Sequence, residues 1–117
     1  MDEIIVRAYT SDQAERIAVS LLKHSGFSAK QATVNYNPSQ GLPPAEYTSN
    51  YPLILEGTLK WHQTRILVYS VTAGYGGSGP LALVNILKEA GFVFDEDDIF
   101  TKKHVDHSGW IRLKYTR

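Results

Sequence analysis

Apolar and polar residues alternate along several stretches of the chain, a pattern that predicts half-buried β-strands. The predicted strands are residues 3–10, residues 28–37, the two arms of a hairpin within 51–73, and residues 109–117. In the first of them Ile4, Val6 and Ala8 share one face. The second arm of the hairpin is almost continuously apolar, so we expect it to lie inside the sheet rather than at an edge.

Two other segments carry apolar residues at the three- to four-residue spacing of an amphipathic helix. The first is capped by Thr10 or Ser11 and stops at Gly26, where glycine can adopt the left-handed conformation that ends many helices. The second begins at Pro80, a residue suited to the first helical position, and stops at Gly91.

The order of these elements predicts an α+β fold in which an antiparallel or mixed sheet carries two helices on one face. Residues 21–28 (LLKHSGFS) and 86–93 (ILKEAGFV) share a pattern, so we interpret the chain as two β-α-β-β-like units. Within the second unit, residues 92–100 are expected to form a short strand or a turn. A length of 117 residues and a hydrophobic content of 43% fit one domain spanning residues 1–117.

The composition argues against several classes of protein. With 12 basic and 12 acidic residues the formal net charge is zero, so we expect no bulk nucleic-acid binding, which depends on neutralising many phosphates. The chain has no cysteine, which excludes disulfides and thiolate zinc sites. No stretch approaches the roughly 20 apolar residues of a membrane span, and the first residues lack the pattern of a signal peptide. We therefore expect a cytoplasmic protein without membrane contacts.

The most distinctive stretch is GYGGSGP, residues 74–80, between the hairpin and the second helix. Its glycines match GxGxxG, but too few residues follow for the repeated units of a dinucleotide-binding domain. Bare backbone ahead of a helix suits a phosphate or carboxylate, whereas a plain glycine-rich turn is the structural alternative. The first strand-to-helix junction, YTSD, is much shorter, and this difference favours a ligand site in the longer one. We place the site at Tyr75, Gly76, Gly77, Ser78 and Gly79.

Four residues outside this loop are candidates to complete the site. Asn85 stands among apolar residues of the second helix, where it either contacts a ligand or belongs to an exposed polar stripe. Arg112 and Lys114 share one face of the last predicted strand, and Arg117 ends the sequence. Such cations either bind phosphates or form a solvated strand edge. Tyr75 itself offers a ring on which a base can stack.

Other polar stretches give weaker indications of chemistry. The runs at 95–98 (DEDD) and 104–107 (HVDH) contain types of metal ligand, but both are typical of solvated loops. The proline-rich segment 38–52 is expected to be a loop, whose Tyr47 and Tyr51 either cover a ligand or pack on the domain. We find no activated nucleophile and no general-base pair, and so expect no catalytic residues, metal or cofactor.

An aromatic residue on a loop, an asparagine on the following helix and cations on a closing strand resemble the Thoeris anti-defence sponges of phages. The residues that carry the resemblance are Tyr75, Asn85, Arg112 and Arg117, in the C-terminal third of the chain. Proteins of that family are oligomers that bind cyclic ADP-ribose isomers and, in some members, cyclic oligonucleotides without cleaving them. The resemblance implies a homo-oligomer that sequesters a signalling nucleotide, in the host cytoplasm if the protein is viral.

These observations lead to one expected function and two alternatives. We expect a non-catalytic module that sequesters a phosphate-bearing signalling nucleotide at residues 75–79. The first alternative is a small protein–protein inhibitor or adaptor that uses the proline-rich loop and the outward strand faces. The second is a small nucleotide-processing enzyme that uses the acids at 95–98.

Overall fold

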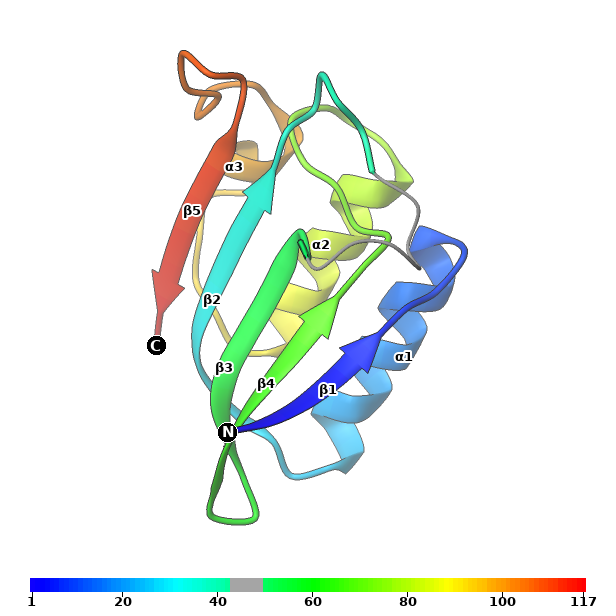
Figure 1. The fold of residues 1–117 in the computed structure, drawn as a ribbon, viewed down its shortest axis with the longest axis vertical. Coiled ribbons are helices and arrows are strands. Elements are labelled where there is room, and N and C mark those ends of the chain that lie inside the picture. Colours follow the sequence, from blue (N-terminus) through cyan, green and yellow to red (C-terminus); the bar gives the residue numbers. More distant parts are fainter. Residues whose placement is uncertain (43–49) are drawn as a thin grey trace.

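The computed structural model describes residues 1–42 and 50–117. Its elements are β1 (Asp2–Val6), α1 (Ser11–His24), β2 (Ser28–Tyr36), β3 (Leu53–Leu59), β4 (His62–Val68), α2 (Ser78–Glu89), α3 (Asp97–Phe100) and β5 (Ile111–Thr116). Figure 1 shows the five strands as one sheet, with the two longer helices behind it. No helix in the described part of the chain is long and apolar enough to cross a membrane.

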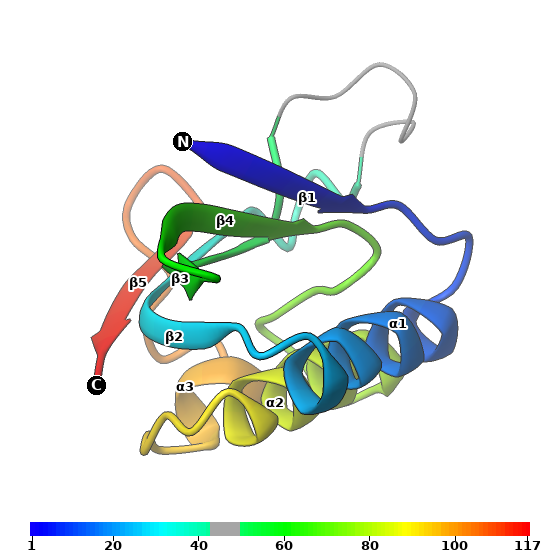
Figure 2. The same ribbon diagram turned by 90° about the horizontal axis from the view of Figure 1, so that it is seen from below.

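The sheet is mixed, with the strand order β1-β4-β3-β2-β5. β1 pairs in parallel with β4, and the other neighbouring pairs are antiparallel. The apolar strand β4 therefore lies inside the sheet, as its composition predicts, while β1 and β5 form the two edges. Figure 2 shows α1 and α2 on the same side of the sheet. The predicted α+β class, with both helices on one face, is confirmed.

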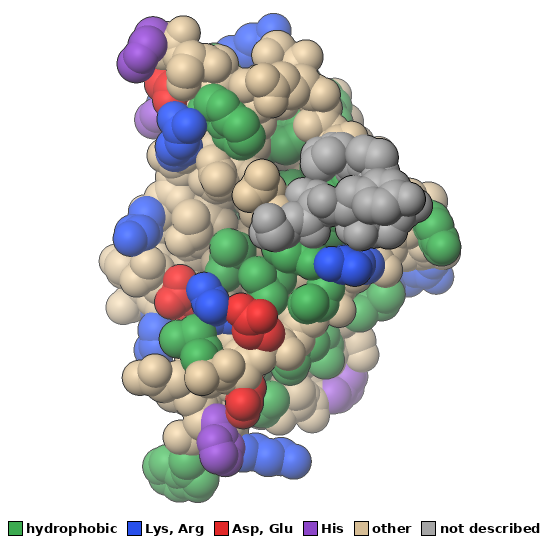
Figure 3. Space-filling model, viewed as in Figure 1, with side chains coloured by type: hydrophobic (Ala, Val, Ile, Leu, Met, Phe, Trp, Pro, Cys, Tyr) green, Lys and Arg blue, Asp and Glu red, His purple; other side chains and the backbone are tan. Residues whose placement is uncertain are grey.

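The core lies between the sheet and the two helices. Alternation along each strand sends one set of side chains toward the helices, and Val34, Leu55 and Ile66 of the inner strands are completely buried there. From the opposite side α2 contributes Leu83 and Leu87, which are equally buried. Among the described residues no helix covers the other face of the sheet, and Figure 3 shows acidic, basic and apolar side chains mixed on it.

The ends of both long helices agree with the signals in the sequence. The hydroxyl of Thr10 accepts a hydrogen bond of 3.2 Å from the backbone N–H of Gln13, which confirms it as the N-cap of α1. Gly26 and Gly91 follow the helices with φ angles of 81° and 92°, left-handed values that favour glycine. α2 begins earlier than predicted, at Ser78, so its proline lies inside the first turn rather than at the first position.

Residues 92–100 do not form a strand; the chain turns here and enters the short helix α3. The carboxylate of Asp95 accepts a hydrogen bond of 2.9 Å from the backbone N–H of Asp97. Such local bonds favour turns and helix starts over strands. Ile99 of α3 is completely buried, so the helix also anchors this segment to the core. The second predicted unit is therefore β4-α2-α3-β5. The helix α3 lies within residues 92–100, for which a short strand or a turn was predicted.

One strand boundary at the N-terminal edge differs from the predicted one, and the hairpin turn is well defined. β1 ends at Val6 rather than at residue 10, and beyond it the backbone N–H of Tyr69 donates to the Val6 carbonyl at 2.9 Å. The β3–β4 hairpin turns through Lys60 and Trp61, whose φ angles of 49° and 73° are both positive. Positive φ at both positions is the conformation of a two-residue type I′ turn, which matches the twist of the flanking strands.

Candidate functional site

The connector between β4 and α2 contains the predicted site, and backbone hydrogen bonds hold it against the domain. The N–H of Thr72 donates to the carbonyl of Gly79 at 3.4 Å, and the N–H of Gly74 donates to the carbonyl of Ile99 at 2.7 Å. Gly74 has a φ of 95°, a left-handed value that explains the glycine at this position. The connector is therefore a defined surface over the core rather than a loose link.

Close packing accounts for two more of the loop glycines. A Cβ atom added to Gly79 would lie 2.0 Å from Oγ1 of Thr72, and one added to Gly77 would lie 3.0 Å from the ring of Tyr75. Gly76 differs, because a Cβ there would meet nothing within 4 Å and its φ is not in the left-handed range. The GxGxxG match thus reflects mainly packing and turn geometry, while Gly76 has no steric reason to be glycine.

The start of α2 is bare of side chains that could satisfy it. Gly77 occupies the N-cap position, no side chain caps the helix, and no acidic residue stands in its first turn. Gly76, Gly77 and Ser78 are exposed. The first N–H groups of a helix have no intrahelical partner, and the helix dipole makes this end positive. The geometry therefore suits an anion that approaches the backbone from solvent.

Tyr75 stands in the loop before α2 and also lines a neighbouring cleft. Its hydroxyl is 2.7 Å from Oγ1 of Thr72, and 43% of the residue remains exposed. The same residue lines a cleft of about 320 Å³ together with Lys102, Val105 and Pro38. Tyr75 is therefore held in position by its hydroxyl, and it lines the same cleft as Lys102.

Lys102 lines the cleft beside the loop, and the sequence did not single it out. It stands beside Lys103, and nothing in the pattern distinguishes the two. In the structure Lys103 forms an ion pair with Asp95 at 3.1 Å, whereas Lys102 lines the cleft beside Tyr75. Which of two adjacent lysines faces the loop depends on the turn after α3, and the sequence gives no signal for that turn.

Asn85 lies away from the glycine loop, at the contact between the two long helices. Its side-chain amide donates a hydrogen bond of 3.2 Å to the carboxylate of Glu15 on α1. The residue is half-buried, so it is neither an exposed stripe nor part of the loop surface. The structure thus shows a helix-to-helix role for Asn85 and does not bring it to the predicted ligand site.

Arg112 and Lys114 lie on the sheet face opposite α1 and α2, because Ile111 of the same strand points into the core. The guanidinium of Arg112 forms an ion pair with Asp106 at 2.6 Å and lies 5.2 Å from the ring centre of Trp110. Hydrogen bonds from Ser108 and Trp110, with the charge of Arg112, lower the pKa of Asp106 to about 2. These cations therefore belong to a surface separate from the loop.

Arg117 is bound at the opposite end of α2. Its guanidinium donates to the carbonyls of Ala90 and Ala29 at 3.2 and 3.3 Å, and it packs against Gly91. Arginine at a helix C-terminus satisfies carbonyls that have no intrahelical partner. Of the predicted site residues the structure brings together Tyr75, Gly76, Gly77, Ser78 and Gly79 only.

No family model, curated protein or solved structure matches this chain. The geometry of the loop, the cleft and the helix start is therefore the basis of the functional argument.

The acidic run and the HVDH run are tied to each other by structural contacts. Asp98 accepts hydrogen bonds from His104 at 2.7 Å and from the hydroxyl of Tyr115 at 2.9 Å. Partial burial raises the pKa of Asp98, but the bonds from His104 and Tyr115 outweigh it and lower the pKa below its usual value. Among the described residues no group of three acidic or histidine side chains is arranged to hold a metal ion.

The proline-rich segment 38–52 contains two tyrosines, of which Tyr47 lies outside the described residues. Tyr51 is buried, and its ring packs edge-on against Tyr69 with a centroid distance of 6.4 Å. Its hydroxyl accepts a hydrogen bond of 2.8 Å from the guanidinium of Arg7. Packing onto the domain, one of the two alternatives for Tyr51, is therefore what the structure shows.

Proposed function

We propose that this protein binds a small phosphate-bearing molecule, such as a signalling nucleotide, at the start of α2 and does not cleave it. The observation that carries the proposal is the uncapped N-terminus of α2, which opens onto Gly76, Gly77 and Ser78 without an acidic residue nearby in the first turn. An anion close to such an end gains about 0.3–1 kcal/mol from the dipole, in addition to hydrogen bonds from the free N–H groups.

The cleft beside the loop supplies a place for the rest of the ligand. In the proposed arrangement the phosphate contacts the backbone of residues 76–79, and Lys102 adds a positive charge at the cleft wall. The base lies against the exposed part of the Tyr75 ring, since stacking on an aromatic ring contributes about 1–3 kcal/mol per base. The cleft volume of about 320 Å³ is within the range of small-molecule sites.

The lining of the cleft supports binding rather than reaction. Among the described residues its polar side chains are those of Ser39, Tyr75 and Lys102, none of them a carboxylate or an imidazole that could act as a general base at neutral pH. Sequestration of a nucleotide in the cytoplasm is the role that follows, and phage anti-defence is the setting that the resemblance of the sequence suggests. The homo-oligomer implied by that resemblance stays a prediction.

A thermal-shift assay with cyclic ADP-ribose isomers, cyclic dinucleotides and NAD tests this proposal. We expect one ligand class to raise the melting temperature and to be recovered unchanged after heat denaturation. Recovery of an altered ligand would favour the nucleotide-processing alternative. No shift with any of these compounds would contradict nucleotide binding and favour a protein partner.

Position 76 offers a matched pair of variants, because a side chain there meets nothing within 4 Å. Gly76→Asp places a negative charge in front of the helix. This charge stabilises the helix through its dipole but repels a bound phosphate. Gly76→Asn has nearly the same shape without the charge. We expect Gly76→Asp to fold normally and to lose ligand binding at least tenfold, while Gly76→Asn keeps most of it. Equal binding by both variants would rule out an anion at this position.

A further inference from the structure

The two edge strands of the sheet differ in how well they are protected against pairing with another strand. In the described part of the chain β1 and β5 are the edges, and an exposed edge is a template for a further strand unless lysines, prolines or bulges protect it. On β5 the cations Arg112 and Lys114 alternate on the open face of the sheet, opposite α1 and α2, so a second β5 would bring like charges together. Val105 also forms a bridge to Ile111 beside this edge. The edge of β5 is therefore protected.

The edge of β1 lacks these features. The strand contains no lysine, proline or glycine, and it pairs with β4 without a register shift from Asp2 to Val6. The carbonyl of Val6 accepts a hydrogen bond of 2.9 Å from the N–H of Tyr69 and so points toward β4. Because backbone groups alternate along a strand, the N–H and C=O groups of Glu3 and Ile5 point away from β4, to the open edge. These groups are free to pair with another strand.

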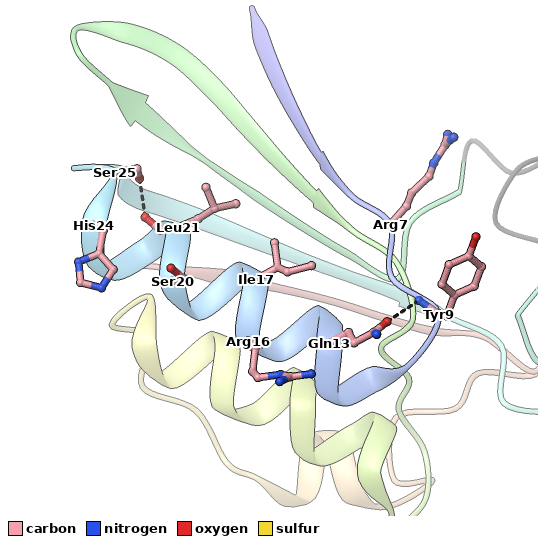
Figure 4. A pocket seen from close by; sticks show the side chains of 9 residues that line it. All are labelled: Arg7, Tyr9, Gln13, Arg16, Ile17, Ser20, Leu21, His24 and Ser25. Carbon is pink, nitrogen blue, oxygen red and sulfur yellow. Dashed lines mark hydrogen bonds between the residues drawn. The ribbon is translucent and has the colours of Figure 1, made fainter.

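Three side chains on the open face of this edge follow the order acidic, apolar, basic. They are Glu3, Ile5 and Arg7, and all three are exposed; Ile5 is 49% exposed although it is apolar. Figure 4 shows Arg7 directed away from α1. The order is self-complementary when two copies of β1 pair antiparallel about a two-fold axis at Ile5, because Glu3 of each copy then stands opposite Arg7 of the other. Opposite charges in such cross-strand positions are favourable.

Both charged side chains can accept a further partner. Arg7 donates from Nε and Nη2 to the hydroxyl of Tyr51 at 3.1 and 2.8 Å, and among the described residues it has no acidic partner. A carboxylate is a stronger acceptor for a guanidinium than this neutral hydroxyl. Glu3 binds Arg65 through Oε2 at 2.7 Å, and its other oxygen can accept from Arg7 of a second copy. The second copy thus supplies the carboxylate that Arg7 lacks.

The helix nearest to β1 leaves this edge open. Figure 2 shows α1 on the helix side of the sheet, below β1 rather than beside it. An open groove of about 900 Å³ is lined by α1 on one side and by Arg7 and Tyr9, which follow β1, on the other. A two-fold axis perpendicular to the sheet places the second α1 on the same side of the sheet as the first, so neither helix occupies the edge.

We propose that the outer edge of β1 is an interface for a second copy of this chain, in which the two β1 strands pair antiparallel and join both sheets into one. Glu3, Ile5 and Arg7 of each copy form the hydrogen-bonded pairs. On the helix side of the same strands Ile4 stands opposite Val6 of the other copy, so the centre of the interface is apolar on both faces. The interface contains no residue of the glycine loop and is independent of the proposed function.

Sedimentation velocity of the full chain at increasing concentration tests for this dimer. We expect a reversible equilibrium between monomer and dimer, with dimers present at or below about 1 mM. Ile5→Lys places two like charges opposite each other at the axis and should weaken dimerisation about tenfold or more, whereas the matched control Ile5→Val should not. Far-UV circular dichroism checks that both variants fold. A chain that stays monomeric at about 1 mM, or dimers that Ile5→Lys leaves unchanged, would overturn the proposal.

Charge reversal at positions 3 and 7 tests the register of the two strands. Arg7→Glu alone brings acidic side chains opposite each other, and Glu3→Lys alone brings basic ones together, so each variant should dimerise more weakly than the parent. A mixture of the two variants restores an opposite-charge pair at both ends of the strand pair. Native mass spectrometry should therefore show heterodimers in excess of either homodimer. A mixture that associates no better than its components would contradict this register.

Amide hydrogen exchange locates the interface along β1. In the dimer the N–H groups of Ile5 and Arg7 are bonded to the other copy, so their exchange should slow as the protein concentration rises. The N–H groups of Ile4 and Val6 point toward β4 in the monomer and in the dimer, and their exchange should change much less. Dimers in which the Ile5 amide exchanges as fast as in the monomer would refute the assignment of this edge.

Discussion

Replacement of Gly79 by alanine tests whether the glycine loop is shaped by packing. In the first turn of α2 an added Cβ would lie 2.0 Å from Oγ1 of Thr72 and 3.2 Å from the hydroxyl of Tyr75. Thr72 is buried, so it cannot simply turn into solvent. To admit the methyl group, Thr72 must rotate and give up its 2.7 Å hydrogen bond to Tyr75, or the helix must shift.

The expected loss of stability is the sum of three effects. Overfilling a tight site costs about 1–3 kcal/mol. The lost hydrogen bond costs about 1 kcal/mol, and the higher helix propensity of alanine returns about the same amount. The net loss for Gly79→Ala is therefore about 1–3 kcal/mol, or roughly 4 °C of melting temperature per kcal/mol for a domain of this size.

Urea unfolding followed by circular dichroism measures this loss, and a second substitution locates its cause. Thr72→Ala removes the oxygen at 2.0 Å and leaves a Cβ contact of 3.1 Å, which is tight but tolerable. The Gly79→Ala/Thr72→Ala double variant should therefore lie within about 1 kcal/mol of the parent. Gly76→Ala is the control and should be neutral or slightly stabilising. A Gly79→Ala variant as stable as the parent, or a double variant as unstable as the sum of its singles, would refute this explanation of the glycine.

Two further predictions concern other parts of the fold. Gly57→Ala places a Cβ 1.9 Å from the backbone carbonyl oxygen of Ser28; because backbone cannot rotate away, we expect a loss of several kcal/mol or failure to fold, measured by the same urea titration. The pKa of Asp106 is lowered to about 2 in the folded protein from its ordinary value of 3.8, and this contributes stability above pH 4 that is lost as pH falls toward 2. Asp106→Asn should flatten the pH dependence of the melting temperature in this window, and an unchanged slope would contradict the role of this carboxylate.

The sequence predicts most of the fold because its signals are local. Thr10, Gly26 and Gly91 fix helix ends through their own backbone conformation or through a bond to a residue three positions away. Strand alternation likewise depends only on neighbours along the chain. Residues 92–100 stayed ambiguous because aromatic and acidic residues fit a strand and a turn equally well. The burial of Ile99, which favours α3, comes from contacts distant in sequence.

The candidate site is predicted only in part, because its members depend on non-local contacts. The glycine loop is visible in the sequence as one continuous stretch. Asn85, however, finds its partner Glu15 across 70 positions, and Arg117 finds Ala90 at the far end of α2. Spacing along the chain carries no information about either pairing. Lys102, which does line the cleft, has the same sequence context as its neighbour.

The most direct test of the proposed function is a nuclear magnetic resonance titration of the ¹⁵N-labelled chain with the nucleotide that gives the largest thermal shift. If a phosphate binds at the start of α2, the backbone amide signals of Gly76, Gly77, Ser78 and Gly79 should move with saturation, and those of Gly26 at the far end of α1 should not. The same titration of Gly76→Asp should leave all of these signals in place. Saturable shifts confined to residues outside 74–79, or none with any ligand of the panel, would contradict the proposed site.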